Sequence, residues 1–162
     1  MRLIQSLLVV ASMFSIQASA QMPQGEYLDG KGVKVAVILA HGQGLDADSQ
    51  VVSPLRKTIH KELGFHTLSL PMPVIAGKRS PEHFQEYAST FPEAYARIQA
   101  AIDFLKKEKG VDRIYLMGYS MGGRMTTAFL ASKPDSSIVG YIGVGLLAHS
   151  ITHNSPRHPS HA

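Results

Sequence analysis

The chain has 162 residues, of which 44% are hydrophobic and 17% charged, with a formal net charge of +4 and no cysteine. This length allows one domain with a real core, and the composition argues against a disordered chain or a bundle of membrane helices. The absence of cysteine excludes disulfides, thiolate nucleophiles and cysteine-based metal sites. Lysine and arginine are spread along the chain, whereas a nucleic-acid-binding surface needs clustered basic residues, so we expect no nucleic-acid partner.

Residues 1–20 have the pattern of a secretory signal peptide. Arg2 gives a minimal positive start, residues 3–16 are mostly apolar, and residues 18–20 (Ala-Ser-Ala) form a small-x-small cleavage pattern. The apolar stretch is too short to span a bilayer, and no later stretch is long enough. We therefore expect a mature chain that starts near Gln21, without a membrane span after cleavage, in the periplasm or secreted. An uncleaved amino-terminal anchor is the alternative.

After the signal, strand-like and helix-like segments alternate. The expected strands are residues 34–40, 65–70, 113–117 and 139–147, and the expected helices are residues 49–63, a segment around 94–105 and residues 121–132. Pro54 suits the first turn of the first helix, and Gly64 and Gly110 predict where the first two helices end. Residues 21–32 predict a linker or a weak edge strand. Residues 71–91, with prolines, glycine and charged residues, predict a loop that overhangs a pocket.

This alternation predicts an α/β fold with a parallel, doubly wound sheet of about four core strands and flanking helices. Ligands of such sheets bind beyond the carboxyl ends of the strands. Two glycine-containing turns, residues 41–44 and 118–123, directly follow predicted strands. We therefore expect these two turns to meet in one crevice.

The second turn, Gly118-Tyr119-Ser120-Met121-Gly122, has the spacing of a nucleophile elbow. In an elbow, a serine on a strained turn between a strand and a helix presents its hydroxyl for attack, and close backbone packing requires the flanking glycines. The bare pattern is weak, but a predicted strand precedes it and a predicted helix follows it. A purely structural glycine-rich turn is the alternative.

Together, His41-Gly42-Gln43-Gly44 and Gly118-Tyr119-Ser120-Met121-Gly122-Gly123 resemble the motifs of the α/β-hydrolase superfamily, particularly its small dienelactone-hydrolase-like members. The resemblance covers roughly residues 33–147, which would match the first half of that fold's core. It implies a serine hydrolase that acts on a small-molecule acyl substrate such as an ester, with neither a metal nor an organic cofactor, and the signal pattern of residues 1–20 makes this an exported one. By this resemblance Ser120 is the nucleophile, the main-chain N–H groups of Gln43 and Met121 form the oxyanion hole, and His41, Gly42, Gly118 and Gly122 support the motifs.

The acid and the base of such a hydrolase are not recognisable in the sequence. The family order is serine, acid, histidine, yet the only acidic residue after Ser120 is Asp135, which precedes the last predicted strand and does not match. A polar tail, residues 148–162, holds four irregularly spaced histidines, His149, His153, His158 and His161. Either the chain is a fragment that ends before the acid and the base, which we favour, or a tail histidine returns to Ser120 as a dyad.

We therefore expect a signal peptide in residues 1–20, an α/β-hydrolase-like domain in residues 21–147 and a histidine-rich tail in residues 148–162. A non-catalytic binding protein that keeps the cleft is the alternative function, and a metal-carrying tail is a more remote one. The last predicted strand would be an exposed apolar edge, so we also expect self-association.

Five further residues have expected roles. His41 is expected to order its loop by hydrogen bonding rather than to act as a base. Asp46 and Asp48 are expected to cap the following helix. Arg124 is expected to contact an anionic substrate or to form a surface salt bridge, and Tyr119 is expected to pack.

Overall fold

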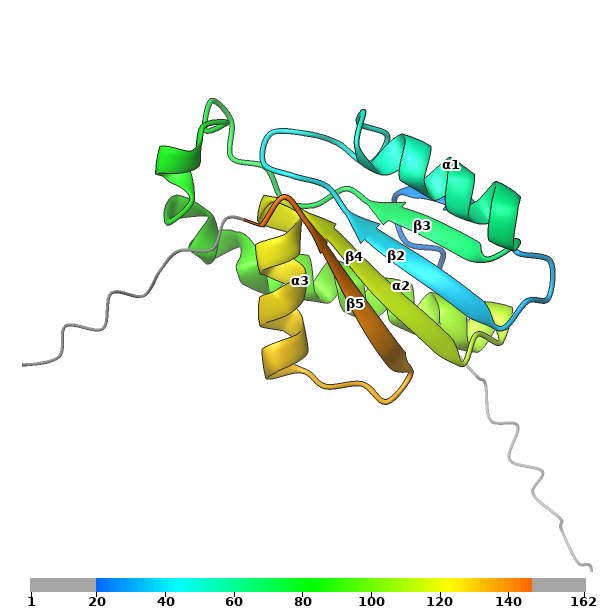
Figure 1. Ribbon diagram of the computed structural model, residues 1–162. Coiled ribbons are helices and arrows are strands. Elements are labelled where there is room, and N and C mark those ends of the chain that lie inside the picture. Colours follow the sequence, from blue (N-terminus) through cyan, green and yellow to red (C-terminus); the bar gives the residue numbers. More distant parts are fainter. Residues whose placement is uncertain (1–19, 147–162) are drawn as a thin grey trace, which may run out of the picture.

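The computed structural model describes residues 20–146 (Figure 1). The predictions for the signal peptide and for the histidine-rich tail concern residues outside this range, apart from Ala20. Five strands form one sheet in the order β1-β3-β2-β4-β5. They are β1 (Glu26–Leu28), β2 (Val35–Ala40), β3 (His66–Leu70), β4 (Arg113–Tyr119) and β5 (Ile138–Val144).

The prediction of a parallel, doubly wound sheet is confirmed. Strands β2, β3, β4 and β5 run parallel, and β1 pairs antiparallel with β3 at the edge of the sheet. The weak edge strand that the sequence allowed within residues 21–32 is therefore present as a fifth strand. At the other edge, β5 ends at Val144 rather than at residue 147.

Three α-helices connect the parallel strands: α1 (Val52–Leu63), α2 (Phe91–Lys109) and α3 (Met121–Ser132). Gly64 and Gly110 adopt the left-handed conformation that ends α1 and α2, with φ of 68° and 65°, as predicted. Pro54 is the third residue of α1, where its missing N–H removes no helical hydrogen bond.

The expected capping of α1 by aspartate is wrong. The residue at the cap is Val51, no side chain caps the helix, and α1 starts at Val52 rather than at residue 49. The carboxylate of Asp48 instead accepts hydrogen bonds from the Ser53 hydroxyl at 2.5 Å and from the buried Arg56 guanidinium at 2.6 Å. Both donors contact the same oxygen, Oδ1 of Asp48, and Oδ1 of Asp46 accepts from the Asp48 N–H at 2.9 Å, so neither aspartate caps α1.

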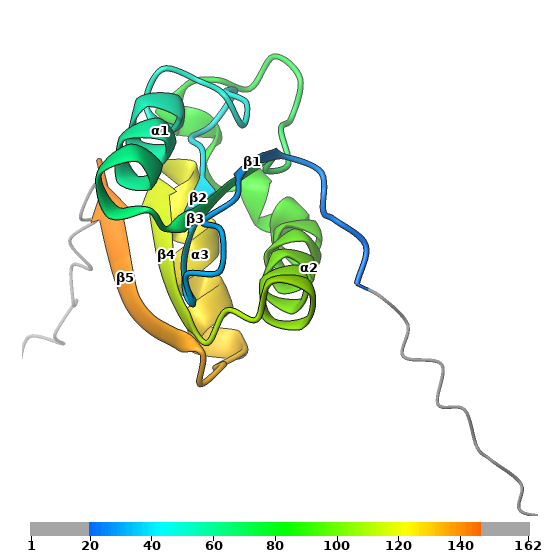
Figure 2. The same ribbon diagram turned by 90° about the vertical axis from the view of Figure 1, so that its right-hand side faces the viewer.

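The helices cover both faces of the sheet, with α1 on one side and α2 on the other (Figure 2). The alternation of side chains along β2 follows from this arrangement. Ala36, Ile38 and Ala40 belong to the larger core with α2 and α3, whereas Val37 and Leu39 belong to a smaller core with α1. Because both faces of β2 are covered, this strand is a continuous apolar run.

The segment of residues 71–90 is more ordered than the plain loop that its composition predicted. It contains two short 3-10 helices, η1 (Pro81–His83) and η2 (Glu86–Thr90). Tyr87 is fully buried, and its hydroxyl accepts a hydrogen bond from the Ile75 N–H and donates one to the Lys78 carbonyl, both at 3.1 Å. Within residues 20–146, no helix is long and apolar enough to cross a membrane.

Candidate active site

Ser120 lies at the junction between β4 and α3, as the elbow motif predicts. Its φ of 51° and ψ of −115° are strained for a residue with a side chain, and Lys31 is the only other non-glycine residue of the described range with positive φ. The main chain holds the turn on both sides. The Ser120 N–H donates to the Val144 carbonyl at 2.9 Å, and the Ser120 carbonyl accepts from the Arg124 N–H at 3.2 Å.

The glycines of the elbow have no space for a side chain. A Cβ atom on Gly118 would lie 2.4 Å from the Gly123 Cα, which belongs to the first turn of α3. A Cβ atom on Gly122 would lie 2.4 Å from the carbonyl oxygens of Ala40 and His41. The elbow therefore packs backbone to backbone against the end of β2, which explains why glycine occupies these positions.

The loop that follows β2 lies against Ser120. In the sheet register, Ala40 at the end of β2 pairs with Gly118 near the end of β4, so the two turns leave adjacent strands at the same edge. A Cβ atom on Gly42 would lie only 3.3 Å from the Ser120 Cβ and 2.8 Å from the Tyr119 ring. The expected meeting of the two turns is thus present, and the Ser120 side chain beside them is half-buried rather than enclosed.

The strand order makes this edge a binding position. β3, which the chain reaches from β2 through α1, pairs with one edge of β2. β4, which the chain reaches from β3 through α2, pairs with the other edge of β2. The order of the sheet therefore reverses between β2 and β4, and ligands of doubly wound sheets bind at such a point. The amide of Met121 is in the first turn of α3, where N–H groups have no acceptor within the helix and the dipole favours negative charge.

The sequence profile of the alpha/beta hydrolase domain family matches residues 33–157. The chain belongs to this family. No curated protein sequence matches it significantly. Among solved structures, it is similar to the protein Atu2452 of unknown function from Agrobacterium tumefaciens, with a TM-score of 0.55 at 16% identity over 70% of this chain and 56% of that one. It is also similar to a dienelactone hydrolase from Anabaena variabilis, with a TM-score of 0.53 at 16% identity over 72% and 54%.

These structural similarities show the fold of the α/β hydrolase domain, and the chain spans just over half the length of both proteins. The matched family region contains both turns of the candidate site. It also contains all five residues of the elbow motif. The fold and the position of the two turns therefore agree with the family assignment. Whether Ser120 can act as a nucleophile depends on the side chains that reach it.

His41 is committed to a structural role, as expected. It is buried, its Nε2 accepts a hydrogen bond from the Met72 N–H at 2.8 Å, and its Nδ1 lies 2.8 Å from the Gly42 carbonyl. Because Nε2 accepts, the proton of the neutral ring is on Nδ1 and is donated to Gly42. Burial lowers the pKa of His41, which favours this neutral form. Both nitrogens are occupied, so His41 is not free to take a proton from Ser120.

The other histidines of the described range have partners away from Ser120. His60 Nδ1 bonds the Phe65 carbonyl at 2.9 Å, at the amino end of β3, and His83 Nδ1 pairs with Glu86 at 2.7 Å. His66 is at the amino end of β3, opposite the site. No histidine or carboxylate within residues 20–146 hydrogen-bonds to the Ser120 hydroxyl, and the four tail histidines lie outside the described residues. Asp135 is held by the Ser137 hydroxyl and by Lys106.

Two residues near the elbow have contacts that the sequence only partly predicted. The Tyr119 ring packs between the backbones of Gly42 and Gly145, as expected of a packing residue. The Arg124 guanidinium lies over the Phe84 ring, 4.7 Å from its centroid. This contact joins the first turn of α3 to the 71–90 segment.

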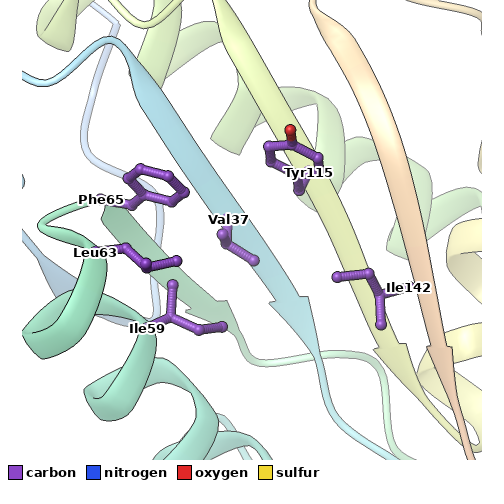
Figure 3. A pocket seen from close by; sticks show the side chains of 6 residues that line it. All are labelled: Val37, Ile59, Leu63, Phe65, Tyr115 and Ile142. Atoms are coloured by element: carbon purple, nitrogen blue, oxygen red, sulfur yellow. The ribbon is translucent and has the colours of Figure 1, made fainter.

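A cavity of about 210 Å³ lies elsewhere, on the face of the sheet that α1 partly covers (Figure 3). Its lining comes from α1 and its following turn and from β2, β4 and β5, and it is entirely apolar: Val37, Ile59, Leu63, Phe65, Tyr115 and Ile142. Neither turn of the candidate site contributes to it. The described residues also contain no cluster of three histidine, aspartate or glutamate side chains suited to a metal ion.

Proposed function

We propose that this α/β hydrolase domain is a serine hydrolase that acts on an ester or a related acyl bond of a small molecule. Ser120 would attack the carbonyl carbon, and the main-chain N–H groups of Gln43 and Met121 would stabilise the oxyanion that develops. The observation that carries the proposal is the strained backbone of Ser120 at the strand–helix junction, against the loop after β2. Such strain is typical of a serine held for attack.

The proposal assigns the acid and the base to no described residue. A serine hydroxyl needs a base to accept its proton during attack, and His41 is fully engaged by the backbone. A base outside the described residues would have to accept the Ser120 proton, and a tail histidine that forms a dyad with Ser120 is one candidate within the chain. The lack of a base for Ser120 among the described residues favours the alternative function, a binding protein that uses this cleft without turnover.

A fluorophosphonate probe separates the two functions. We expect the intact protein to be labelled, the Ser120→Ala variant to be unlabelled, and the Ser89→Ala variant, which changes an exposed serine, to be labelled like the parent protein. The site of modification is read by peptide mass spectrometry. If Ser120 stays unmodified while small acyl compounds bind in a calorimeter, the binding function replaces the hydrolase.

We also propose that the protein is exported, on the signal-like pattern of residues 1–20. Amino-terminal sequencing of protein from the periplasmic fraction tests this. We expect a mature terminus near Gln21, and an intact Met1 in the membrane fraction would instead indicate an anchor.

A further inference from the structure

The Gln43 side chain joins the loop after β2 to the 71–90 segment. Its Nε2 donates to the Lys78 carbonyl at 2.6 Å and to the Ser80 carbonyl at 3.0 Å. Carbonyl oxygens only accept, so this pair of contacts fixes which end of the carboxamide is the nitrogen. Both amide hydrogens are thus used, across 35 and 37 residues of sequence.

The acceptor at Lys78 is itself held by the core. Tyr87 is 0% exposed, and its hydroxyl donates to the same Lys78 carbonyl at 3.1 Å. The turn is closed by a hydrogen bond from the Lys78 N–H to the Ile75 carbonyl at 3.1 Å. Gln43 is therefore attached to a fixed point and not to a freely moving loop.

The next residue, Gly44, is confined by the same 71–90 segment. Gly44 has φ of +68°, and a Cβ atom on it would lie 2.6 Å from Arg79 Cγ. The aliphatic part of Arg79 thus covers the backbone of Gly44, while Gly42 on the other side of Gln43 lies against Tyr119 and Ser120. The backbone at residue 43 is held by contacts before it, after it and through its own side chain.

We propose that the Gln43 carboxamide is a positioning group, which fixes the main-chain N–H of the same residue for the oxyanion. This inference rests on the proposed function of Ser120. Donors of an oxyanion hole act because they are in place before the reaction, and a displacement of about 1 Å at a site can cost on the order of 100-fold in rate. Without the carboxamide, the N–H of residue 43 would still be present but would not be held.

Two variants of the full-length protein test this. Gln43→Met keeps the length of the side chain and removes both donors. Gln43→Glu keeps the shape and places a carboxylate against two carbonyl oxygens, so its effect should be larger. Gln85→Met is the matched control, because Gln85 is exposed in the same segment. Cooperative thermal unfolding shows that each variant is folded.

We expect Gln43→Met to lower the maximal rate of Ser120 labelling by roughly 10- to 100-fold, with little change in the probe concentration at half-maximal rate. Amide hydrogen exchange should rise by 10-fold or more at Leu45 and Lys78 together, whose N–H groups are hydrogen-bonded to the Gly42 and Ile75 carbonyls, and Gln85→Met should change neither quantity. Unchanged exchange in Gln43→Met overturns the attachment. Faster exchange with unchanged labelling overturns the positioning role.

The exchange measurement does not depend on a reactive serine. If the parent protein is not labelled at Ser120, the proposed function fails, and the positioning role fails with it. The attachment between the two loops is then still decided by exchange alone. The two failures are therefore distinguishable.

Discussion

Gly122→Ala is a direct test of the contact between the elbow and the end of β2. In an exposed helix this change would stabilise the protein by about 1 kcal/mol, because alanine has the higher helix propensity. Here the new Cβ would lie 2.4 Å from two backbone oxygens, of Ala40 and His41, whereas real Cβ contacts shorter than 3.0 Å essentially never occur. Backbone atoms at the end of a central strand cannot move aside as a flexible side chain can, so we expect the upper end of the cost of overpacking, about 3 kcal/mol.

The net expectation is a loss of about 2 kcal/mol, which for a domain of this size is about 4–8 °C in the melting temperature. The free energy of unfolding is measured by denaturant titration of the parent and the variant. Gly64→Ala is the control: nothing lies within 4 Å of its added Cβ, so it has only the strain of φ +68°, about 1 kcal/mol. A Gly122→Ala protein that is as stable as its parent, or more stable, would refute the packing of the two turns.

The parts of this fold that the sequence predicts are those in which side chains encode the structure. The apolar run of β2 indicates a strand covered on both faces, and glycines that adopt positive φ mark the ends of α1 and α2. The elbow is predictable because its glycines are sterically required: Gly118 and Gly122 have backbone atoms where a Cβ would be. These signals are local, so a single sequence is sufficient to read them.

What the sequence does not predict are contacts to main-chain atoms and competition for side chains. The sequence-based prediction starts α1 three residues too early, at residue 49 instead of Val52, and assigns its cap to an aspartate. In the structure the Asp48 carboxylate bonds the side chains of Ser53 and Arg56 instead. The order of the 71–90 segment depends on the buried Tyr87 and on short 3-10 turns, which have no long periodicity. The attachment of Gln43 is equally hidden, since its acceptors are carbonyls, which every residue has.

Three further substitutions test the hydrogen bond of Tyr87, the exposed edge strand and the buried His66. Tyr87→Phe removes the tyrosine donor of the half-buried Lys78 carbonyl and the acceptor of the Ile75 N–H, and we expect a loss of about 1–2 kcal/mol by denaturant titration; a neutral result would show that water replaces the hydroxyl. Val139→Lys places a charge on the outer edge strand, where Val139 is 48% exposed, and we expect it to lower self-association in sedimentation experiments while changing stability by less than about 0.5 kcal/mol. An unchanged mass at high protein concentration would exclude association through this edge. Burial lowers the pKa of His66 below its usual value of 6.5, although the nearby Asp29 carboxylate opposes the shift. The folded state therefore prefers the neutral ring, so the stability due to His66 is fully present above about pH 6.5 and is lost as the pH falls through the lower folded pKa. We expect the unfolding free energy of the parent to decrease on acidification from pH 7 to 5, and His66→Gln to reduce that slope. An equal slope in both proteins would mean that His66 binds its proton equally in the folded and unfolded states.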